Sequence, residues 1–198
     1  MHEPLPLAQI HEAVFEFLRG REDAVLFGAQ AVNAYTSEPR MTQDIDLLST
    51  RAGELAEELR EHLSFKFHIA VRVREVADGK GFRVYQTQKS GNRHLVDLRL
   101  IEKLPDTREV ESIQILAPAA LIASKVISYA SRRGKPKAGT DWRDLAMLLL
   151  TFPELKSETS AVANCLKDAG ANDDVMKLWR ELVAQEFEFE DEDEDLAF

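Results

Sequence analysis

The first third of the chain alternates between helical spacing and short apolar runs. Apolar residues three and four positions apart over residues 7–18 predict an amphipathic helix, and Gly20 marks its end. The apolar run before Gly28 is typical of a buried strand, and a helical pattern begins directly after this glycine. In full, this part predicts strands at residues 23–27 and 44–49 and further helices at residues 29–35 and 51–63.

The middle of the chain follows the period of two that half-buried strands show. Asp78 and Gly79 stand between two of these runs and favour a tight hairpin turn. The strands predicted here cover residues 66–75, 82–88, 94–101 and 113–116. Together with the two earlier strands, they predict a mixed sheet.

The last third of the chain has a helical pattern. Pro118 fits the first turn of a helix, because a helix start leaves its first N–H groups unpaired and proline has none. A loop rich in glycine, proline and lysine is expected at residues 134–139, with Thr140 as the N-cap of the next helix. The helices predicted here cover residues 119–132, 141–150, 158–168 and 172–185.

These patterns predict an α+β protein in three regions. The regions are a mixed sheet with flanking helices in residues 1–116, a C-terminal helical bundle in residues 117–185, and a disordered acidic tail in residues 186–198. The net charge of −10 is concentrated in the tail, where eight carboxylates lie within residues 186–195. The remainder is close to neutral, so overall acidity does not exclude a nucleic-acid partner.

Composition excludes several classes of protein. Hydrophobic residues make up 44% of the chain and charged residues 30%, which suits a globular protein with a real core. Cys165 is the single cysteine, so neither an intramolecular disulfide nor a cysteine-based zinc site can form. The longest apolar run, residues 145–150, is too short to span a bilayer, and the N-terminal sequence lacks the features of a secretory signal. We expect a cytoplasmic protein without a membrane partner.

The segment Asp44-Ile45-Asp46 is the strongest candidate for chemistry. Residues two apart in a strand point to one face, so the two carboxylates would repel each other unless a cation neutralised them. Mg²⁺ suits this position, because it takes carboxylates together with substrate phosphates. The spacing alone is equally compatible with an exposed edge strand that carries two solvated aspartates.

Two further positions favour the interpretation of this motif as a metal site. Gly28 stands between a strand and a helix, where free N–H groups and the positive end of the helix dipole suit a phosphate. Asp97 interrupts a later strand and would be a third carboxylate, and three carboxylates can hold two metal ions roughly 3.5–4 Å apart. Without the motif, Gly28 would be an ordinary turn and Asp97 an ordinary polar position.

Four segments together resemble a known family. They are FGAQAVNAY, RMTQDIDLL, HLVDLRL and KVISYASRRGKPKAGTDWRDLAML. In order and spacing they are similar to the minimal nucleotidyltransferases of the DNA polymerase beta superfamily, and most similar to the AbiEii/AbiGii toxin branch of abortive-infection and type IV toxin–antitoxin systems. The resemblance covers about residues 24–149 and implies a nucleotidyltransferase fold for the mixed sheet.

The resemblance also implies roles for individual residues. The metal ligands for Mg²⁺ or Mn²⁺ would be Asp44, Asp46 and Asp97, and the catalytic residues would be these three with Lys125 and Asp141. The nucleotide would be bound by Gly28, Ala29, Arg40, Thr42 and Lys125.

Three of these residues are ambiguous. The family usually has Gly or Ser where this chain has Ala29, which offers its backbone N–H but no hydroxyl. Lys125 could instead be a solvated helix lysine, and Asp141 a first-turn carboxylate favoured by the helix dipole. Asp144 lies one turn after Asp141, so one of the two aspartates could orient Lys125 or assist proton removal from the acceptor hydroxyl.

The remaining candidates are less specific. A basic cluster around the loop could contact a triphosphate or RNA, or could simply be solvated; its members are Arg132, Arg133, Lys135, Lys137 and Arg143. The histidines show no metal-ligand spacing and receive no role, and Trp142 and Trp179 are expected in the core.

The leading hypothesis is a metal-dependent nucleotidyltransferase. It would move a nucleoside monophosphate from an NTP to a hydroxyl of a tRNA or protein acceptor, and it could be the toxin of a toxin–antitoxin pair with an antitoxin partner. One alternative, motivated by Ala29, is a degenerate module that binds a nucleotide or a partner without turnover. A weaker alternative is a glycosyltransferase that uses its D-x-D segment with a nucleotide sugar.

Overall fold

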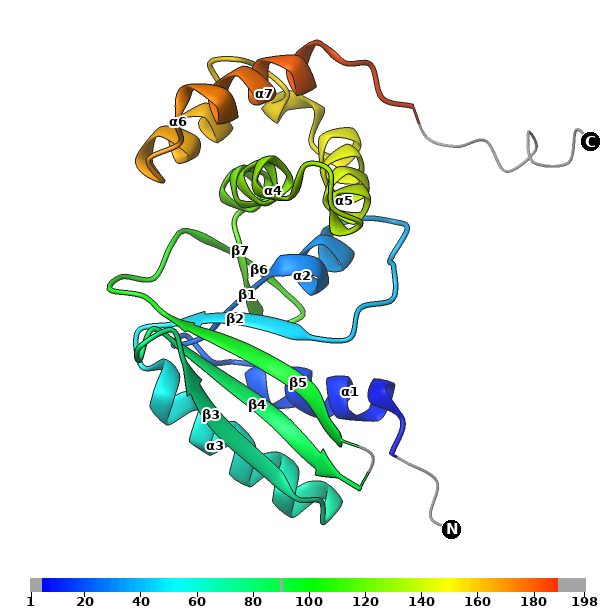
Figure 1. Ribbon diagram of the computed structural model, residues 1–198, viewed down its shortest axis with the longest axis vertical. Helices are drawn as coiled ribbons and strands as arrows, with labels where there is room; N and C mark the ends of the chain where they lie inside the picture. Colours follow the sequence, from blue (N-terminus) through cyan, green and yellow to red (C-terminus); the bar gives the residue numbers. More distant parts are fainter. Residues whose placement is uncertain (1–4, 90, 189–198) are drawn as a thin grey trace, which may run out of the picture. The chain divides into compact units, whose positions relative to one another are not determined.

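The computed structural model describes residues 5–89 and 91–188 (Figure 1). The chain forms two compact units. The first unit takes the residues up to 34 together with residues 39–117, and the second takes residues 35–38 and the chain after residue 117. The segment 35–38 is thus an insertion from the second unit between two parts of the first.

The first unit is built on a seven-stranded mixed sheet with the order β3-β4-β5-β2-β1-β7-β6. Its strands are β1 (Val25–Phe27), β2 (Ile45–Ser49), β3 (Val71–Val76), β4 (Gly81–Gln88), β5 (Gly91–Leu100), β6 (Thr107–Val110) and β7 (Ile113–Leu116). Its helices are α1 (Leu7–Leu18), α2 (Gly28–Tyr35) and α3 (Ala52–Phe67). β1 runs parallel to β7 and β2 parallel to β5, whereas the other neighbours are antiparallel.

The two faces of this sheet differ in character. The face under α3 is apolar, because α3 lies against β3, β4 and β5 and buries a leucine on each successive turn: Leu55, Leu59 and Leu63. The ring of Phe82 packs against Gly53 of α3, so Arg83, the next residue of β4, lies on the opposite face. The strand register extends that opposite face into one row across the sheet: Phe27, Asp46, Asp97, Arg83 and Arg74.

The second unit is helical. It comprises α4 (Pro118–Arg132), α5 (Lys137–Thr151), the short 3-10 helix η1 (Pro153–Leu155), α6 (Ala161–Asp168) and α7 (Asp173–Ala184). α4 packs against α5, α6 and α7, and Trp179 of α7 is fully buried. The inserted segment 35–38 contacts the helices of this unit at both of its ends. The Tyr35 ring packs edge-on against Phe152 at 5.5 Å, and the backbone oxygen of Glu38 accepts a hydrogen bond from Arg143.

The predicted fold class is confirmed, since a mixed sheet with flanking helices is followed by a helical region. No helix among the described residues is long and apolar enough to cross a membrane. The predicted tail, residues 186–198, lies mostly outside the described residues. In the described part of it, the Phe187 ring lies 6.2 Å from that of Trp142, and Lys156 stands over it at 5.1 Å.

One strand prediction was wrong at its start. The alternation from residue 66 predicted a strand, but α3 continues to Phe67 and β3 begins only at Val71. His68 ends the helix in the left-handed conformation, at φ 52°. Phe67 fitted the alternation of the predicted strand, but it is the last residue of the helix and is only half-buried.

Three smaller expectations also failed. The strand β6 was missed because it is an edge strand with almost entirely exposed side chains, and no apolar alternation marks it. Thr140 is not an N-cap, since α5 begins at Lys137, directly after Pro136, whose backbone already has helical angles. Trp142 is 39% exposed and therefore not a core residue.

Candidate active site

The strand register brings the predicted carboxylates to one face of the sheet. Asp46 on β2 is directly opposite Asp97 on β5, and residues opposite each other in a ladder share a face. Asp44 precedes β2 by one residue and is close enough to Arg83 for its charge to raise the pKa of that guanidinium. The charges of all three carboxylates are therefore felt on the same face of the sheet, the one opposite α3.

Gly28 shapes the position of Asp46. It has a φ of +73°, a conformation that L-residues adopt only with strain, and it forms the start of α2. A Cβ atom at this position would lie 2.1 Å from the Oδ2 atom of Asp46, so only glycine leaves room for the carboxylate. The carboxylate thus lies at the N-terminus of α2, where the helix dipole stabilises negative charge. Ala29, the next residue, is buried.

Arg83 is a member of this group that the sequence did not reveal. Its Nε donates a hydrogen bond to Asp97 Oδ1 at 2.7 Å, and a second guanidinium nitrogen lies 3.4 Å from Oδ2. The two side chains are each about 30% exposed. The hydrogen bonds to Asp97, and secondarily the fields of Asp97 and Asp44, raise the pKa of Arg83 above its ordinary value, so the guanidinium stays charged. Another cation, Arg99, stands 4.8 Å from the centre of the Phe27 ring.

The carboxylates fit a cation only in part. Within the described parts of the chain, no three Asp, Glu, His or Cys side chains are grouped so that they could hold a metal ion by themselves. Mg²⁺ is commonly held by one or two protein carboxylates together with substrate phosphates. Asp44 and Asp46 suit this second arrangement, whereas Asp97 is already paired with Arg83.

The loop that precedes Asp44 is held from two helices. Asn33 of α2 donates to the backbone oxygen of Arg40 at 2.8 Å and accepts from the Arg40 N–H at 3.0 Å. His11 of α1 makes a hydrogen bond of 3.2 Å with the backbone oxygen of Gln43, and its other ring nitrogen lies 3.3 Å from the amide of Gln30. We call these contacts the loop clamp.

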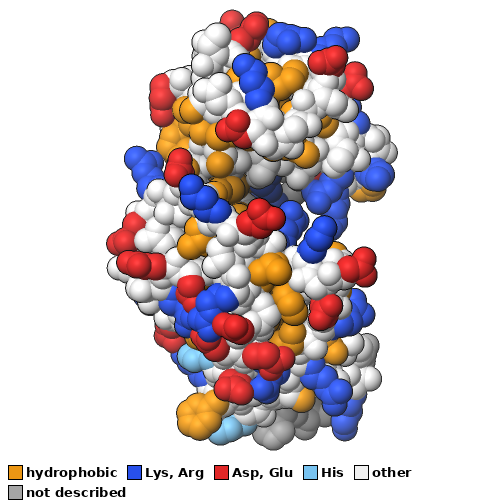
Figure 2. Space-filling model, turned by 90° about the vertical axis from the view of Figure 1, so that its left-hand side faces the viewer, with side chains coloured by type: hydrophobic (Ala, Val, Ile, Leu, Met, Phe, Trp, Pro, Cys, Tyr) orange, Lys and Arg blue, Asp and Glu red, His pale blue; other side chains and the backbone are white. Residues whose placement is uncertain are grey.

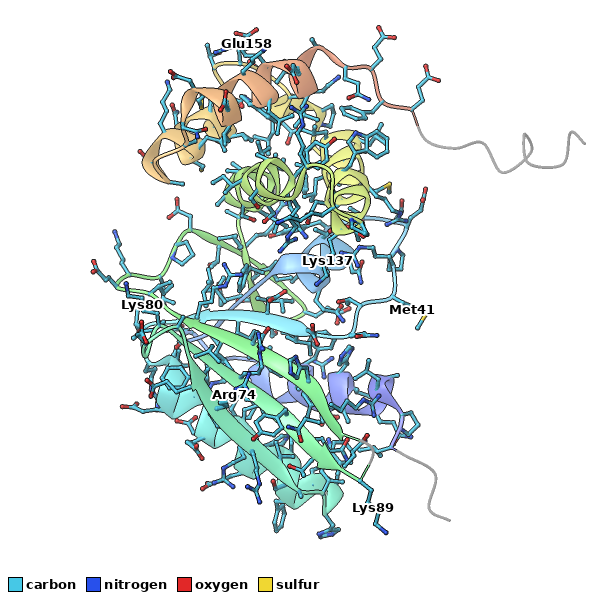
Figure 3. All side chains as sticks on the ribbon, in the orientation of Figure 1. Met41, Arg74, Lys80, Lys89, Lys137 and Glu158 are labelled. Atoms are coloured by element: carbon cyan, nitrogen blue, oxygen red, sulfur yellow. The ribbon has the colours of Figure 1, made fainter. Side chains whose placement is uncertain are left out.

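Two predicted nucleotide-binding residues lie in this clamped loop. Thr42 donates from its hydroxyl to the backbone oxygen of Asp44 at 3.2 Å, and Arg40 donates to the backbone oxygen of Met41. Between them, Met41 is 97% exposed and projects into solvent (Figure 3). The pKa of His11 is lowered, chiefly by burial, so the ring is neutral near pH 7.

In the second unit, Lys125 and Asp144 form a buried ion pair. The lysine Nζ donates to Asp144 Oδ2 at 2.7 Å, and the side chains are 8% and 0% exposed. Asp141 instead accepts two hydrogen bonds from Arg132, at 2.9 and 3.0 Å. The aspartate that orients Lys125 is therefore Asp144.

The basic cluster of the second unit is largely paired. Arg132 binds Asp141, Arg133 reaches Glu181 at 3.3 Å, and Arg143 reaches Glu38 at 3.7 Å. On the face shown in Figure 2, acidic and basic side chains are likewise interspersed. The arginines of this cluster thus have partners within the unit.

The solved structures that this chain resembles define its class. The Megavirus polyadenylate synthase superposes with a TM-score of 0.60 at 14% identity, over 74% of this chain and 32% of that enzyme, so the chain spans about a third of it. A Helicobacter pylori protein assigned as a nucleotidyltransferase gives a TM-score of 0.55 at 15% identity, over 89% and 90% of the two chains. JHP933 from the same organism gives 0.53 at 16% identity, over 89% and 87%. The fold is that of a nucleotidyltransferase.

A match to a sequence family classifies the chain more narrowly than its fold does. A family described as "Nucleotidyl transferase AbiEii toxin, Type IV TA system" matches residues 13–197. The chain belongs to the AbiEii family, which confirms the resemblance seen in its motifs. No curated protein sequence matches it significantly.

Proposed function

We propose that this protein transfers a nucleotidyl group from a nucleoside triphosphate to an acceptor hydroxyl, with Asp44 and Asp46 as ligands of the Mg²⁺ or Mn²⁺ that accompanies the nucleotide. The observation that carries the proposal is the placement of Asp46, opposite Asp97 and against Gly28 at the start of α2. When bound, the cation would neutralise charge on the phosphates and so favour attack at phosphorus.

The residues of the chain then have the following tasks. The oxygen of the acceptor hydroxyl attacks the α-phosphorus, a new P–O bond forms, and the bond to the β-phosphate breaks with release of pyrophosphate. Asp97 lies across from Asp46 and receives the proton of the hydroxyl. Gly28 and the backbone N–H of Ala29 allow a phosphate to approach the start of α2. The proposal keeps the predicted nucleotide-binding roles of Arg40, Thr42 and Lys125.

The proposed acceptor and partner are supported by the family resemblance rather than by the structure. A toxin of a type IV system implies an antitoxin partner and an NTP substrate, both present in the cytoplasm where we expect this protein to act. We propose a tRNA 3′ end or a protein hydroxyl as acceptor.

A transfer assay tests this proposal. The full chain would be incubated with each α-labelled NTP, Mg²⁺ and either total tRNA or cell extract, and the labelled macromolecule identified. We expect Asp46→Asn to lower the rate by about 100-fold or more, because it removes charge where the phosphates are bound. The matched control is Asp78→Asn in the exposed β3–β4 turn, at φ 51°, which asparagine also tolerates.

The alternatives give different results in the same assay. Full activity of Asp46→Asn would overturn the proposed site. Nucleotide binding by calorimetry without transfer to any acceptor would favour the degenerate binding module, for which Ala29 is the motive.

A further inference from the structure

A cavity in the first unit lies on the other side of the sheet from Asp46. It has a volume of about 350 Å³ and is lined by residues of α1, α2, β1, β7 and the β6–β7 hairpin. Leu26 of β1 lines it, and because Phe27 shares a face with Asp46, the Leu26 side chain lies on the opposite face. A cavity of this size, at the lower end of the range for ligand sites, suits a small molecule. Most of its lining is apolar: Phe15, Leu26, Ala34, Val110, Ile113 and Ile115.

A cation and an anion stand together in the lining of this cavity. The Arg19 guanidinium and the Glu111 carboxylate are 3.9 Å apart, and their side chains are 50% and 79% exposed. The backbone sets this placement, because the Gly20 N–H donates to the carbonyl of Ser112 at 2.7 Å and so holds the end of α1 on the hairpin turn. A separation of 3.9 Å is too long for a hydrogen bond, so both charged groups keep hydrogen-bonding capacity for a ligand.

The hairpin turn that carries Glu111 is strained. Glu111 and Ser112 have φ values of 49° and 63°, although neither residue is glycine. A two-residue turn with two positive φ angles favours asparagine followed by glycine. Residues held in such conformations are concentrated at binding sites, where the surrounding structure compensates for the strain. The position of the Glu111 carboxylate at the cavity gives this turn a reason to carry a glutamate.

We propose that this cavity binds a free α-amino acid with an apolar side chain. The carboxylate of the amino acid pairs with Arg19 and its ammonium group with Glu111, while its side chain packs against the apolar lining. A simple carboxylic acid would bring its charge against Glu111, and a simple amine would bring its charge against Arg19. The zwitterion matches both charges, so the pair selects for it. This binding site does not depend on the proposed function.

The cavity shares two residues with the loop clamp. Gln30 and Asn33 of α2 line it, and their amides also contact the His11 ring and the backbone of Arg40. A ligand packed against these two amides restricts their motion, so the hydrogen bonds that hold the loop open less often. Occupancy of the cavity therefore stabilises the loop that leads to Asp44, without any contact between the amino acid and the candidate site.

Calorimetry with free leucine tests the binding site. Leucine is titrated into the full chain and compared with two analogues: leucinamide, which lacks the carboxylate, and isocaproate, which lacks the ammonium group. We expect leucine to bind about tenfold more tightly than either analogue, because each analogue loses one charge-assisted hydrogen bond. Free glutamate should bind more weakly than leucine, since its charged side chain would enter an apolar lining.

Four variants sharpen this test. Arg19→Gln should weaken leucine binding by about tenfold, whereas Arg72→Gln, exposed on the opposite edge strand β3, should leave it unchanged. Ala34→Leu keeps both charges but adds atoms to the lining, and it should abolish binding. Glu111→Asn removes the carboxylate and suits the turn better, so it should weaken binding without lowering the melting temperature. Loss of binding in this variant is then separable from loss of folding.

Hydrogen exchange tests the coupling to the loop. The Arg40 N–H donates to Asn33, so saturating leucine should slow amide exchange in residues 39–44 of the unaltered protein and leave it unchanged in Ala34→Leu. The site is overturned if isocaproate or leucinamide binds as tightly as leucine, or if Arg19→Gln binds leucine no more weakly than Arg72→Gln. Leucine binding without slower exchange in residues 39–44 would overturn the coupling. Neither readout requires nucleotidyl transfer, so failure of the proposed function would leave both results interpretable.

Discussion

In the first unit, the carboxylates of the candidate site are half-buried and lie beside a glycine, a helix start and a partly exposed guanidinium, whereas in the second unit Lys125 and Asp144 face each other in the interior. Partly solvated charges can change partners when a ligand binds. A buried pair cannot do so cheaply, because either charge alone would be strongly destabilised. The comparison separates charges that can exchange partners at low cost from a charge pair on which the stability of the helical unit also depends.

The largest expected effect tests the buried pair. Lys125→Met leaves Asp144 without its lysine partner in the interior, so we expect the free energy of unfolding to fall by about 3–5 kcal/mol. Urea denaturation followed by circular dichroism measures this change. Lys125→Met combined with Asp144→Leu should recover much of the loss, since neither charge of this pair then remains in the interior. A single variant within about 1 kcal/mol of the unaltered protein would contradict the structural role of the pair.

A second experiment tests the contact between Gly28 and Asp46. Gly28→Ala should displace the Asp46 carboxylate and lower nucleotidyl transfer by about 100-fold, because small displacements of reacting groups have effects of this size. Gly134→Ala is the matched control: its φ of +79° imposes the same strain, but nothing lies within 4 Å of the added atom. If both variants lose activity equally, backbone strain rather than the Asp46 contact is responsible.

The loop clamp should have a more moderate influence. Asn33→Ala removes two hydrogen bonds to the backbone of Arg40, each worth about 1 kcal/mol, and frees the loop that leads to Asp44. We expect a KM for the nucleotide raised about fivefold and a smaller change in melting temperature. Asn164→Ala on the exposed side of α6 is the control. An unchanged KM would show that the loop keeps its conformation without the clamp.

The smallest effect concerns pH. The pKa of His11 is lowered in the folded protein from its ordinary value of 6.5, mainly by burial. Below pH 6.5 the unfolded chain binds a proton on His11 that the folded protein binds more weakly. The free energy of unfolding therefore falls as the pH drops below 6.5. Between about pH 7 and about pH 5, the unaltered protein should lose more stability than His11→Gln. Parallel losses in urea denaturation at both pH values would contradict this linkage.

How much of the site the sequence predicted depends on the kind of interaction. The alternation around Asp44, Asp46 and Asp97 was enough to expect them on one face, because strand periodicity fixes which side chains share a face. Arg83 could not be found in this way. Its partner depends on a one-residue bulge, and a shift of one residue moves every side chain to the other face.

The loop clamp was hidden for a different reason. Asn33 and His11 act on backbone atoms of residues that lie 7 and 32 positions further along the chain, and contacts with backbone atoms leave no pattern in side-chain type. His11 received no role because the histidines lack metal-ligand spacing, whereas a hydrogen bond to a backbone oxygen requires no such spacing. The choice between Asp141 and Asp144 also needed the structure, since both lie in the same helix one turn apart.

The inserted segment 35–38 has a consequence for engineering. A cut after residue 117 does not separate the two units, because the N-terminal fragment would carry away Tyr35 and Glu38 from their partners Phe152 and Arg143. Chimaeras between family members should therefore exchange residues 35–38 together with the helices of the second unit, as two non-contiguous pieces of DNA. Otherwise the helices of one protein would have to pack against the 35–38 segment of another.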